Sequence, residues 1–196
     1  MISQKTDVKP TDLRGILQYI PRFRKQTFVI SADGAVISDV NFTNLLLDIA
    51  VLRSLNIRVV LAHGAGEQIR QLAVEREMTP SNLDGTGITD DATLELAMSA
   101  ANRLTHEILE GLSVSDQRAS SANAIVSHPK GVIEGVDQQH TGRIERVDIS
   151  MLKTLLAEDI IPVIPPLGLD GEGNTFRLNS DAIALAVSEA LGAIKL

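Results

Sequence analysis

The sequence predicts an α/β protein, a three-layer α/β/α sandwich with a mostly parallel sheet between two layers of helices. Short β-branched runs such as residues 57–62 have the pattern of buried parallel strands. Stretches with apolar residues three and four apart, as in residues 41–55, predict helices. The two kinds of segment alternate over the first 75 residues. This alternation implies a parallel sheet with right-handed crossovers.

The N-terminal region predicts a helix that precedes the first strand. The segment TDLRGILQYIPRF after the polar residues 1–10 places aliphatic side chains on one helical face, at Leu13, Ile16, Leu17 and Ile20. Pro21 is expected to stop or kink this helix. We therefore expect a tail and amphipathic oligomerisation helix over 1–25 and a domain over 26–196. The apolar face has two possible partners, its own domain or another subunit.

The stretch His63-Gly64-Ala65-Gly66 joins the strand over 57–62 to a helix that starts near Glu67. Small residues let a ligand approach bare backbone, and the amide groups that open a helix favour an anion. The stretch lacks the third glycine of a dinucleotide site and the Lys-Ser/Thr of a P-loop. We predict ligand contacts here, with a plain tight turn as the alternative.

The segments on either side of this turn are assigned in order. Phe28-Val29-Ile30 is the expected first strand, with a turn over 31–34. A loop over 79–88 follows the central helix. Thr89 is expected to cap the next helix and Gly111 to end it.

The C-terminal part continues the alternation. Residues 124–126 are predicted to form a strand, and residues 131–147 a small hairpin that lies over the sheet. Asp148 is expected to cap a helix that precedes a strand over 160–164, where Pro162 is awkward for a central position. Residues 168–174 are expected to form a loop.

The last helix is predicted to start at Asn179 or Ser180 and to end at Gly192. Residues 193–196 then begin what is predicted to be another strand. We therefore expect the native chain to continue past Leu196, which intact mass spectrometry of the native protein would test.

Composition excludes several classes of function. A net charge of −7 argues against nucleic acid as the main partner, because phosphate binding needs a basic face. The absence of Cys excludes disulfides and thiolate metal sites, and the four His lack ligand spacing, so we predict no metal. No run of the sequence reaches the length of a membrane span, and the N-terminus lacks a signal-peptide core. A cytoplasmic protein is the expectation.

Three blocks resemble the amino acid kinase family, specifically N-acetylglutamate kinase and its relative N-acetylglutamate synthase. IRVVLAHGAGEQI resembles the VVLVHGGGPQI-type block, and GITDDATLELAMSA resembles the G-x-R-V-T-D-A-x-T-x-E block. Residues 135–191 resemble, nearly end to end, the stretch that precedes the second half of those enzymes. The leading helix resembles the extra helix of arginine-sensitive members, which interlaces dimers into a hexameric ring. The resemblance covers residues 11–196 and implies the amino acid kinase fold. It implies that residues 26–196 are an amino acid kinase-like domain without the C-terminal half that holds the nucleotide.

Departures from the family pattern bear on activity. The kinases carry a Lys in K-x-G-G after the first strand, and its charge offsets that of the transferring phosphoryl group. Ser31 occupies that position here, and Asp33 adds a negative charge. Gly87 matches the substrate-binding Arg of R-V-T-D, and Arg177 matches the first Asn of N-x-N-A-D. Kinase chemistry is therefore expected to be lost, with Asp181 as a residual acidic position and no confident catalytic residue.

Loss of the Lys on a retained scaffold resembles the synthase. In that group the kinase-like domain binds arginine as a feedback signal and assembles the oligomer. A separate acetyltransferase domain acetylates L-glutamate from acetyl-CoA in the first step of arginine biosynthesis. The resemblance implies a regulatory and assembly part with ligand contacts at Gly64, Ala65, Gly66, Arg177, Asn179 and Asp181. Arg177 is expected to supply a replacement guanidinium for a carboxylate ligand.

The expected ligand is glutamate, N-acetylglutamate or arginine, and the expected partner is a second copy of the chain. No cofactor is expected on this stretch, whereas acetyl-CoA is implied for the acetyltransferase domain. Two other functions stay open. An N-acetylglutamate kinase-type phosphotransferase would need another cation, and Lys25 lies too early in the sequence. A non-catalytic scaffold would only oligomerise through the N-terminal helix. A dinucleotide-linked enzyme is disfavoured by the missing third glycine.

Overall fold

The computed structural model describes residues 19–196. Leu13, Ile16 and Leu17 of the predicted oligomerisation face lie outside the described residues, whereas Ile20 lies in a helix over residues 19–23. Pro21 is inside this helix rather than at its end, because the fixed φ angle of proline is compatible with helical backbone.

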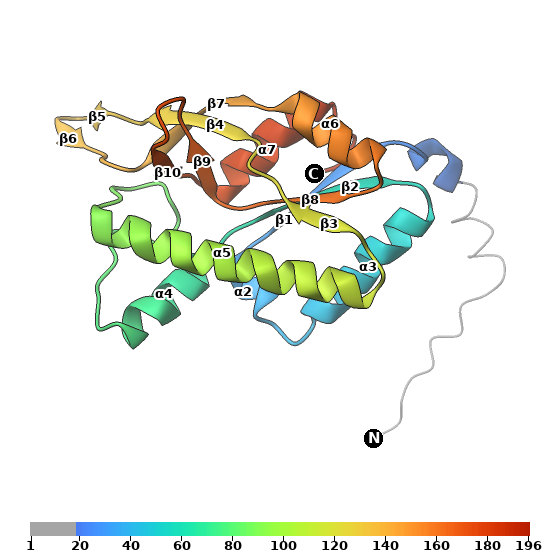
Figure 1. Ribbon diagram of the computed structural model, residues 1–196, viewed down its shortest axis with the longest axis horizontal. Coiled ribbons are helices and arrows are strands. Elements are labelled where there is room, and N and C mark those ends of the chain that lie inside the picture. Colours follow the sequence, from blue (N-terminus) through green and yellow to red (C-terminus); the bar gives the residue numbers. More distant parts are fainter. Residues whose placement is uncertain (1–18) are drawn as a thin grey trace, which may run out of the picture.

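A parallel sheet runs through the middle of the described part of the molecule (Figure 1). Its strands are, in spatial order, β1 (Thr27–Ala32), β2 (Arg58–His63), β8 (Ile161–Ile164) and β3 (Ala119–Ser121). Every neighbouring pair is parallel. β2 is apolar and buried from Val59 onward, as expected for a strand covered on both faces.

Helices cover both faces of this sheet, which confirms the predicted three-layer α/β/α architecture. One layer comprises α2 (Gly34–Ile37), α3 (Phe42–Ser54), α4 (Gly66–Glu75) and α5 (Asp91–Val114). The other comprises α6 (Ile149–Ala157) and α7 (Ser180–Leu191). Each layer packs on its own aliphatic core, with Ile49, Leu61 and Leu104 in the first and Val60, Leu152 and Ile183 in the second.

A second, mixed sheet lies beside the first. It contains β10 (Thr175–Arg177), β9 (Leu167–Leu169), β4 (Ile125–Pro129) and β7 (Gly142–Val147), in that spatial order. The strand expected near residues 124–126 therefore belongs to this sheet. Only β5 (Val132–Ile133) and β6 (Val136–Asp137) form the small hairpin expected over 131–147, whereas β7 pairs antiparallel with β4. The expected loop over 168–174 is mostly the turn between β9 and β10.

The hydrophobic pattern of the sequence did not predict two features of the main sheet, namely strand β3 and the proline inside β8. Residues 119–121 form strand β3 although they are small and polar, because the edge of the sheet supplies the pairing. Pro162 is tolerated in central strand β8 because pairing with β2 begins only at Val163. The missing N–H group of Pro162 therefore removes no hydrogen bond between β8 and β2.

Helix α5 begins and ends differently from expectation. Asp90, rather than Thr89, is the N-cap, and its side chain accepts a hydrogen bond from the Thr93 backbone at 2.7 Å. Thr89 is fully buried and bonds the Thr141 hydroxyl instead. Gly111 does not end the helix, which continues to Val114. A Cβ on Gly111 would collide with the Leu46 side chain of α3, so the glycine allows the two helices to pack closely.

The other predicted helix ends are confirmed. Asp148 caps α6 by accepting from Met151, and Asn179 caps α7 by accepting from Ala182. Gly192 ends α7 in the left-handed conformation, at φ 61°. The residues after it begin to pair with β1, through a parallel bridge between Lys195 and Phe28.

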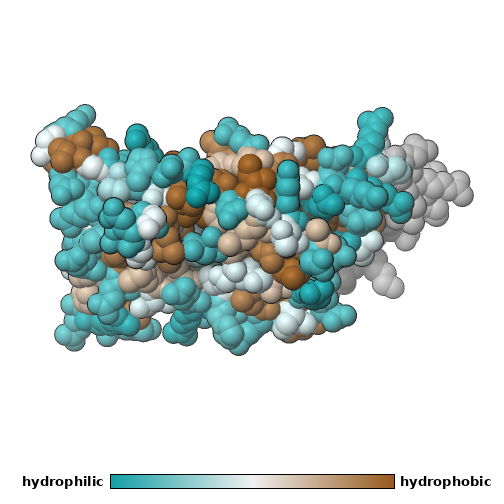
Figure 2. Space-filling view, turned by 45° about the horizontal axis from the view of Figure 1, so that its top comes forward, coloured by the Kyte–Doolittle hydropathy of each residue, from teal (hydrophilic) through white to brown (hydrophobic). Residues whose placement is uncertain are grey.

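Exposed apolar side chains gather on the β5–β6 hairpin, at Val132, Ile133 and Val136. They form the brown patch at the far left of the space-filling view (Figure 2). A second apolar surface, a groove beside β1, is lined by residues including Tyr19, Ile20, Phe23 and Leu196. Within residues 19–196, no helix is both long and apolar enough to cross a membrane.

Candidate functional site

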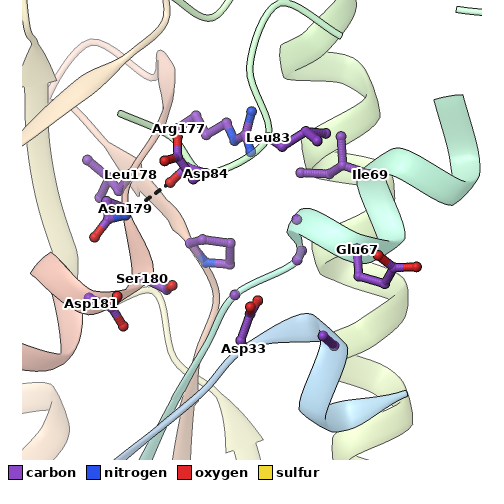
Figure 3. Close-up of a pocket in the computed structure, with 15 residues that line it drawn as sticks. Asp33, Glu67, Ile69, Leu83, Asp84, Arg177, Leu178, Asn179, Ser180 and Asp181 are labelled. Carbon is purple, nitrogen blue, oxygen red and sulfur yellow. Dashed lines mark hydrogen bonds between the residues drawn. The ribbon is translucent and has the colours of Figure 1, made fainter. Parts of the chain in front are cut away.

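A cleft of about 310 Å³ opens where the strands of the main sheet end (Figure 3). Asp33 follows β1, Gly64 follows β2 and Pro166 follows β8. The carboxyl ends of parallel strands are the usual binding edge of an α/β sheet. The cleft is lined by Asp33, Ala35, Gly64, Ala65, Gly66, Glu67, Ile69, Leu83, Asp84, Pro166, Arg177, Leu178, Asn179, Ser180 and Asp181.

The two glycines of the turn after β2 are required by close neighbours. A Cβ on Gly64 would lie 3.1 Å from both Asp33 Oδ1 and Ser180 Oγ. A Cβ on Gly66 would lie 2.9 Å from the Leu83 carbonyl oxygen. The bare backbone therefore lets the end of β1, the start of α7 and the loop over 79–88 meet at one point.

The loop over 79–88 covers one side of the cleft and is bonded to residues of the second sheet and of the start of α7. Arg177 Nη1 donates to Asn82 O at 2.7 Å and to Asn82 Oδ1 at 3.1 Å. Asn179 Nδ2 donates to Asp84 O at 3.1 Å, the dashed line of Figure 3. The Thr141 hydroxyl bonds Gly87 O. Sequence reasoning missed this covering loop, since its partners lie about 50 to 95 residues away.

Arg177 is 2% exposed and lies at the roof of the cleft, beside Leu83 in Figure 3. Burial lowers the pKa of Arg177 to about 10, and the charge of Asp84 opposes this change. The guanidinium therefore stays protonated at neutral pH. Among the described residues, the hydrogen bonds that Arg177 donates leave from Nη1 alone.

Two of the carboxylates that line the cleft are already engaged. Glu67 accepts hydrogen bonds from Arg70, which hold the pKa of Glu67 below its usual value. Asp84 accepts from the backbone and hydroxyl of Thr86, and these bonds lower the pKa of Asp84. Both groups are therefore anionic at neutral pH and satisfied within the chain.

The other two carboxylates, Asp33 and Asp181, lack a cationic partner within residues 19–196. Asp181 accepts from the Ser31 hydroxyl at 3.2 Å, so the residue at the position of the kinase Lys contacts a carboxylate. No lysine lines the cleft in the part of the chain that the structure describes. The excess of carboxylates over cationic side chains around the cleft would repel a transferring phosphoryl group.

The helix that starts at the glycine turn is a further polar element of the site. α4 has ten residues, and its N-cap, Ala65, supplies no side-chain hydrogen bond. Its first amide groups therefore face the cleft without a side-chain cap. The start of α7 differs, because Asn179 caps it.

All six predicted ligand contacts line the cleft together, namely Gly64, Ala65, Gly66, Arg177, Asn179 and Asp181. Asn179 has both polar atoms of its side chain bonded within the chain. His63 is fully buried, with Nε2 2.8 Å from Thr105 Oγ1 of α5, and does not line the cleft. Within residues 19–196, no cluster of three or more His, Asp or Glu side chains is arranged to hold a metal ion.

A family model described as the amino acid kinase family matches residues 26–196. The chain belongs to the amino acid kinase family. It is 37% identical over 187 residues to an amino-acid acetyltransferase of Vibrio cholerae, covering 91% of this chain and 42% of that relative. It is 38% identical over 193 residues to one from Pseudomonas fluorescens, covering 94% of this chain and 45% of the relative. The chain thus spans less than half the length of these curated relatives.

Solved structures that resemble this chain also include an N-acetylglutamate synthase. N-acetylglutamate synthase from Neisseria gonorrhoeae, complexed with coenzyme A and N-acetyl-glutamate, superposes with a TM-score of 0.83 at 32% identity. The match covers 92% of this chain and 43% of the synthase. Isopentenyl phosphate kinase, at 18% identity and a TM-score of 0.54, shares the fold alone. The resemblance of the sequence to N-acetylglutamate synthase and to the amino acid kinase fold is confirmed.

Proposed function

We propose that this chain is the ligand-binding regulatory and assembly part of an amino-acid acetyltransferase, and that its own cleft no longer transfers phosphoryl groups. The contact between Ser31 and Asp181 carries the proposal. A kinase needs a cation at this edge of the sheet. Here the Ser31 hydroxyl donates to the Asp181 carboxylate, and Asp33, two residues after Ser31, adds a second negative charge. The acetyltransferase relatives support the rest of the assignment.

For the whole protein we propose acetylation of L-glutamate from acetyl-CoA, in the cytoplasm and in arginine biosynthesis. The structural relative holds coenzyme A, which supports acetyl-CoA as the acyl donor. The cleft of this chain would then bind an amino-acid ligand as a signal. Arg177, the turn at Gly64–Gly66 and Asp181 are its proposed contacts.

Incubation of the purified chain with ATP and N-acetyl-L-glutamate tests the loss of kinase activity. We expect no acyl phosphate above the background without protein, by hydroxylamine trapping. Isothermal titration calorimetry with L-glutamate, L-arginine and N-acetyl-L-glutamate should detect binding of at least one. Phosphoryl transfer that disappears in an Asp181→Asn variant would contradict the proposal.

The assembly role is proposed for the helix that carries Leu13, Ile16, Leu17 and Ile20. It is supported by the apolar groove beside β1, where Ile20 and Phe23 lie next to Leu55 and Leu196. Light scattering of the whole chain and of a variant lacking residues 1–24 tests this role. We expect a homo-oligomer for the whole chain and a smaller particle for the truncated one. Equal particle mass per chain would contradict it.

A further inference from the structure

The β5–β6 hairpin stands apart from the two larger sheets. Among residues 19–196, β5 and β6 pair only with each other, and they lie at the far left of Figure 1. Val132, Ile133 and Val136 of this hairpin are 68%, 40% and 47% exposed. A two-stranded hairpin is only marginally stable in water, and its exposed apolar side chains favour a partner. A further strand along the hairpin would therefore stabilise it.

The base of the hairpin is bonded to the body of the molecule. The Lys130 amide donates to Thr141 O at 2.8 Å, and the Gln138 amide donates to Gly131 O at 3.0 Å. Lys130 Nζ donates to Thr86 O at 2.8 Å. An ammonium group has three donors, so two of them remain for another acceptor. These bonds fix the direction in which the hairpin projects.

The outer edge of β5 is open to another strand. Val132 lies opposite Asp137 of β6, and the next pair toward the base is joined by the bond from Gln138 to Gly131. Hydrogen-bonded and non-hydrogen-bonded pairs alternate in an antiparallel ladder, so the Val132 N–H and C=O groups point away from β6. Proteins usually block such an edge with a charged residue or a proline, and Val132 is neither.

The charges around Val132 fit a second copy of the same strand. Lys130 and Glu134 lie two residues before and two residues after Val132. When two copies of β5 pair antiparallel about Val132, two-fold symmetry places each Lys130 opposite the Glu134 of the other copy. Neither residue forms an ion pair with another residue within 19–196. Pairing of β6 with β6 would instead bring two Asp137 carboxylates together, which is unfavourable.

We propose that β5 pairs antiparallel with β5 of a second copy about Val132, so that two hairpins form one four-stranded sheet. This surface lies at the opposite end of Figure 1 from the helix over residues 19–23. It therefore adds a second contact to the proposed assembly role and does not depend on the N-terminal helix.

Single-cysteine variants test this pairing, because the chain has no Cys. In the paired strands the two Val132 Cα atoms lie about 5.5 Å apart, inside the disulfide range of about 4.4–6.8 Å. The two Val136 Cα atoms lie about 14 Å apart, which is three strand spacings. We expect copper-phenanthroline oxidation of the whole chain to link Val132→Cys about ten-fold faster than Val136→Cys. Val74→Cys, 75% exposed on α4, is the control for random collision.

Charge reversal on the Val132→Cys background tests the register. Glu134→Lys makes both facing pairs repulsive, and we expect it to slow linking about ten-fold. Adding Lys130→Glu restores opposite charges and should recover the rate, although it removes the bond to Thr86 O. Glu77→Lys is the matched control, because Glu77 is exposed at φ 55° and Glu134 at φ 50°. It should leave the rate unchanged.

The outcomes keep the two assembly surfaces apart. Equal linking rates for Val132→Cys and Val136→Cys would overturn the pairing of β5. Equal effects of Glu134→Lys and Glu77→Lys would overturn it as well, since the register about Val132 requires the charge at residue 134. Light scattering of the variant that lacks residues 1–24 reports on the N-terminal helix instead. Its failure would contradict the role of that helix alone.

Discussion

Arg177 and Asn82, 95 positions apart in the sequence, are joined by two hydrogen bonds from a single guanidinium nitrogen, at 2.7 and 3.1 Å. The first ends on the Asn82 backbone oxygen, so it fixes the path of the loop over 79–88 as well as one side chain. The same guanidinium lines the cleft. Arg177 therefore links the shape of the covering loop to the charge presented to a ligand.

Replacement of Arg177 is expected to destabilise the chain. Arg177→Met keeps approximate length but removes the Nη1 donor, which leaves the Asn82 backbone oxygen without this partner, whereas Asn82 Oδ1 still accepts from the Gly85 amide. The free energy of unfolding should fall by about 2–3 kcal/mol, measured by urea denaturation. Arg58→Ala, on an exposed position of β2, should change it by less than about 0.5 kcal/mol. Equal effects of the two changes would contradict the structural role of Arg177.

The glycines at the cleft make a second, steric prediction. Gly66→Ala places a Cβ 2.9 Å from the Leu83 carbonyl, a backbone atom that moves only with its loop. We expect a loss of about 1–3 kcal/mol in the free energy of unfolding and weaker binding of any cleft ligand. The control is Gly171→Ala, where a Cβ meets no atom of the described chain within 4 Å. A Gly66→Ala variant as stable as this control would show that the turn is not close-packed.

The sequence predicted the layers and the binding edge because those depend on local pattern. Apolar runs and helical spacing identify β2, α3 and α7, and the glycine turn marks the end of β2. The second sheet was not predicted, since β9 lies parallel to β4 across about 40 intervening residues and strands this short carry little periodicity. The covering loop was missed for the same reason, as its bonds to Arg177 and Thr141 are all long-range.

The start of α5 gives a third prediction. Asp90 accepts from the Thr93 amide, so Asp90→Ala leaves a helix-opening N–H group without a partner. The free energy of unfolding should fall by about 1 kcal/mol in chemical denaturation. Asp48→Ala, on the exposed face of α3, is the control and should be close to neutral. A larger loss in Asp48→Ala than in Asp90→Ala would contradict the assignment of the cap.

His63 makes stability depend on pH in the mildly acidic range. It lies between β2 and α5, with Nε2 on Thr105 Oγ1 at 2.8 Å and Nδ1 on Gly64 O at 3.2 Å. Burial lowers the pKa of His63 from 6.5 to about 4, although the bond to Gly64 opposes this change. The unfolded chain therefore takes up a proton at higher pH than the folded chain does. Stability falls as pH drops through 6.5 and levels off below the folded pKa of about 4.

The expected loss is about 3 kcal/mol between pH 7 and pH 4, since each unit of pKa difference corresponds to about 1.4 kcal/mol. Urea denaturation at several pH values should show it, and a His63→Gln variant should have a flatter profile above pH 4.5. His106→Gln, on the exposed face of α5, should retain the parent profile. NMR titration of the His63 imidazole in the folded parent chain gives an independent check. Protonation of that ring near pH 6.5 would contradict both its burial and the predicted profile.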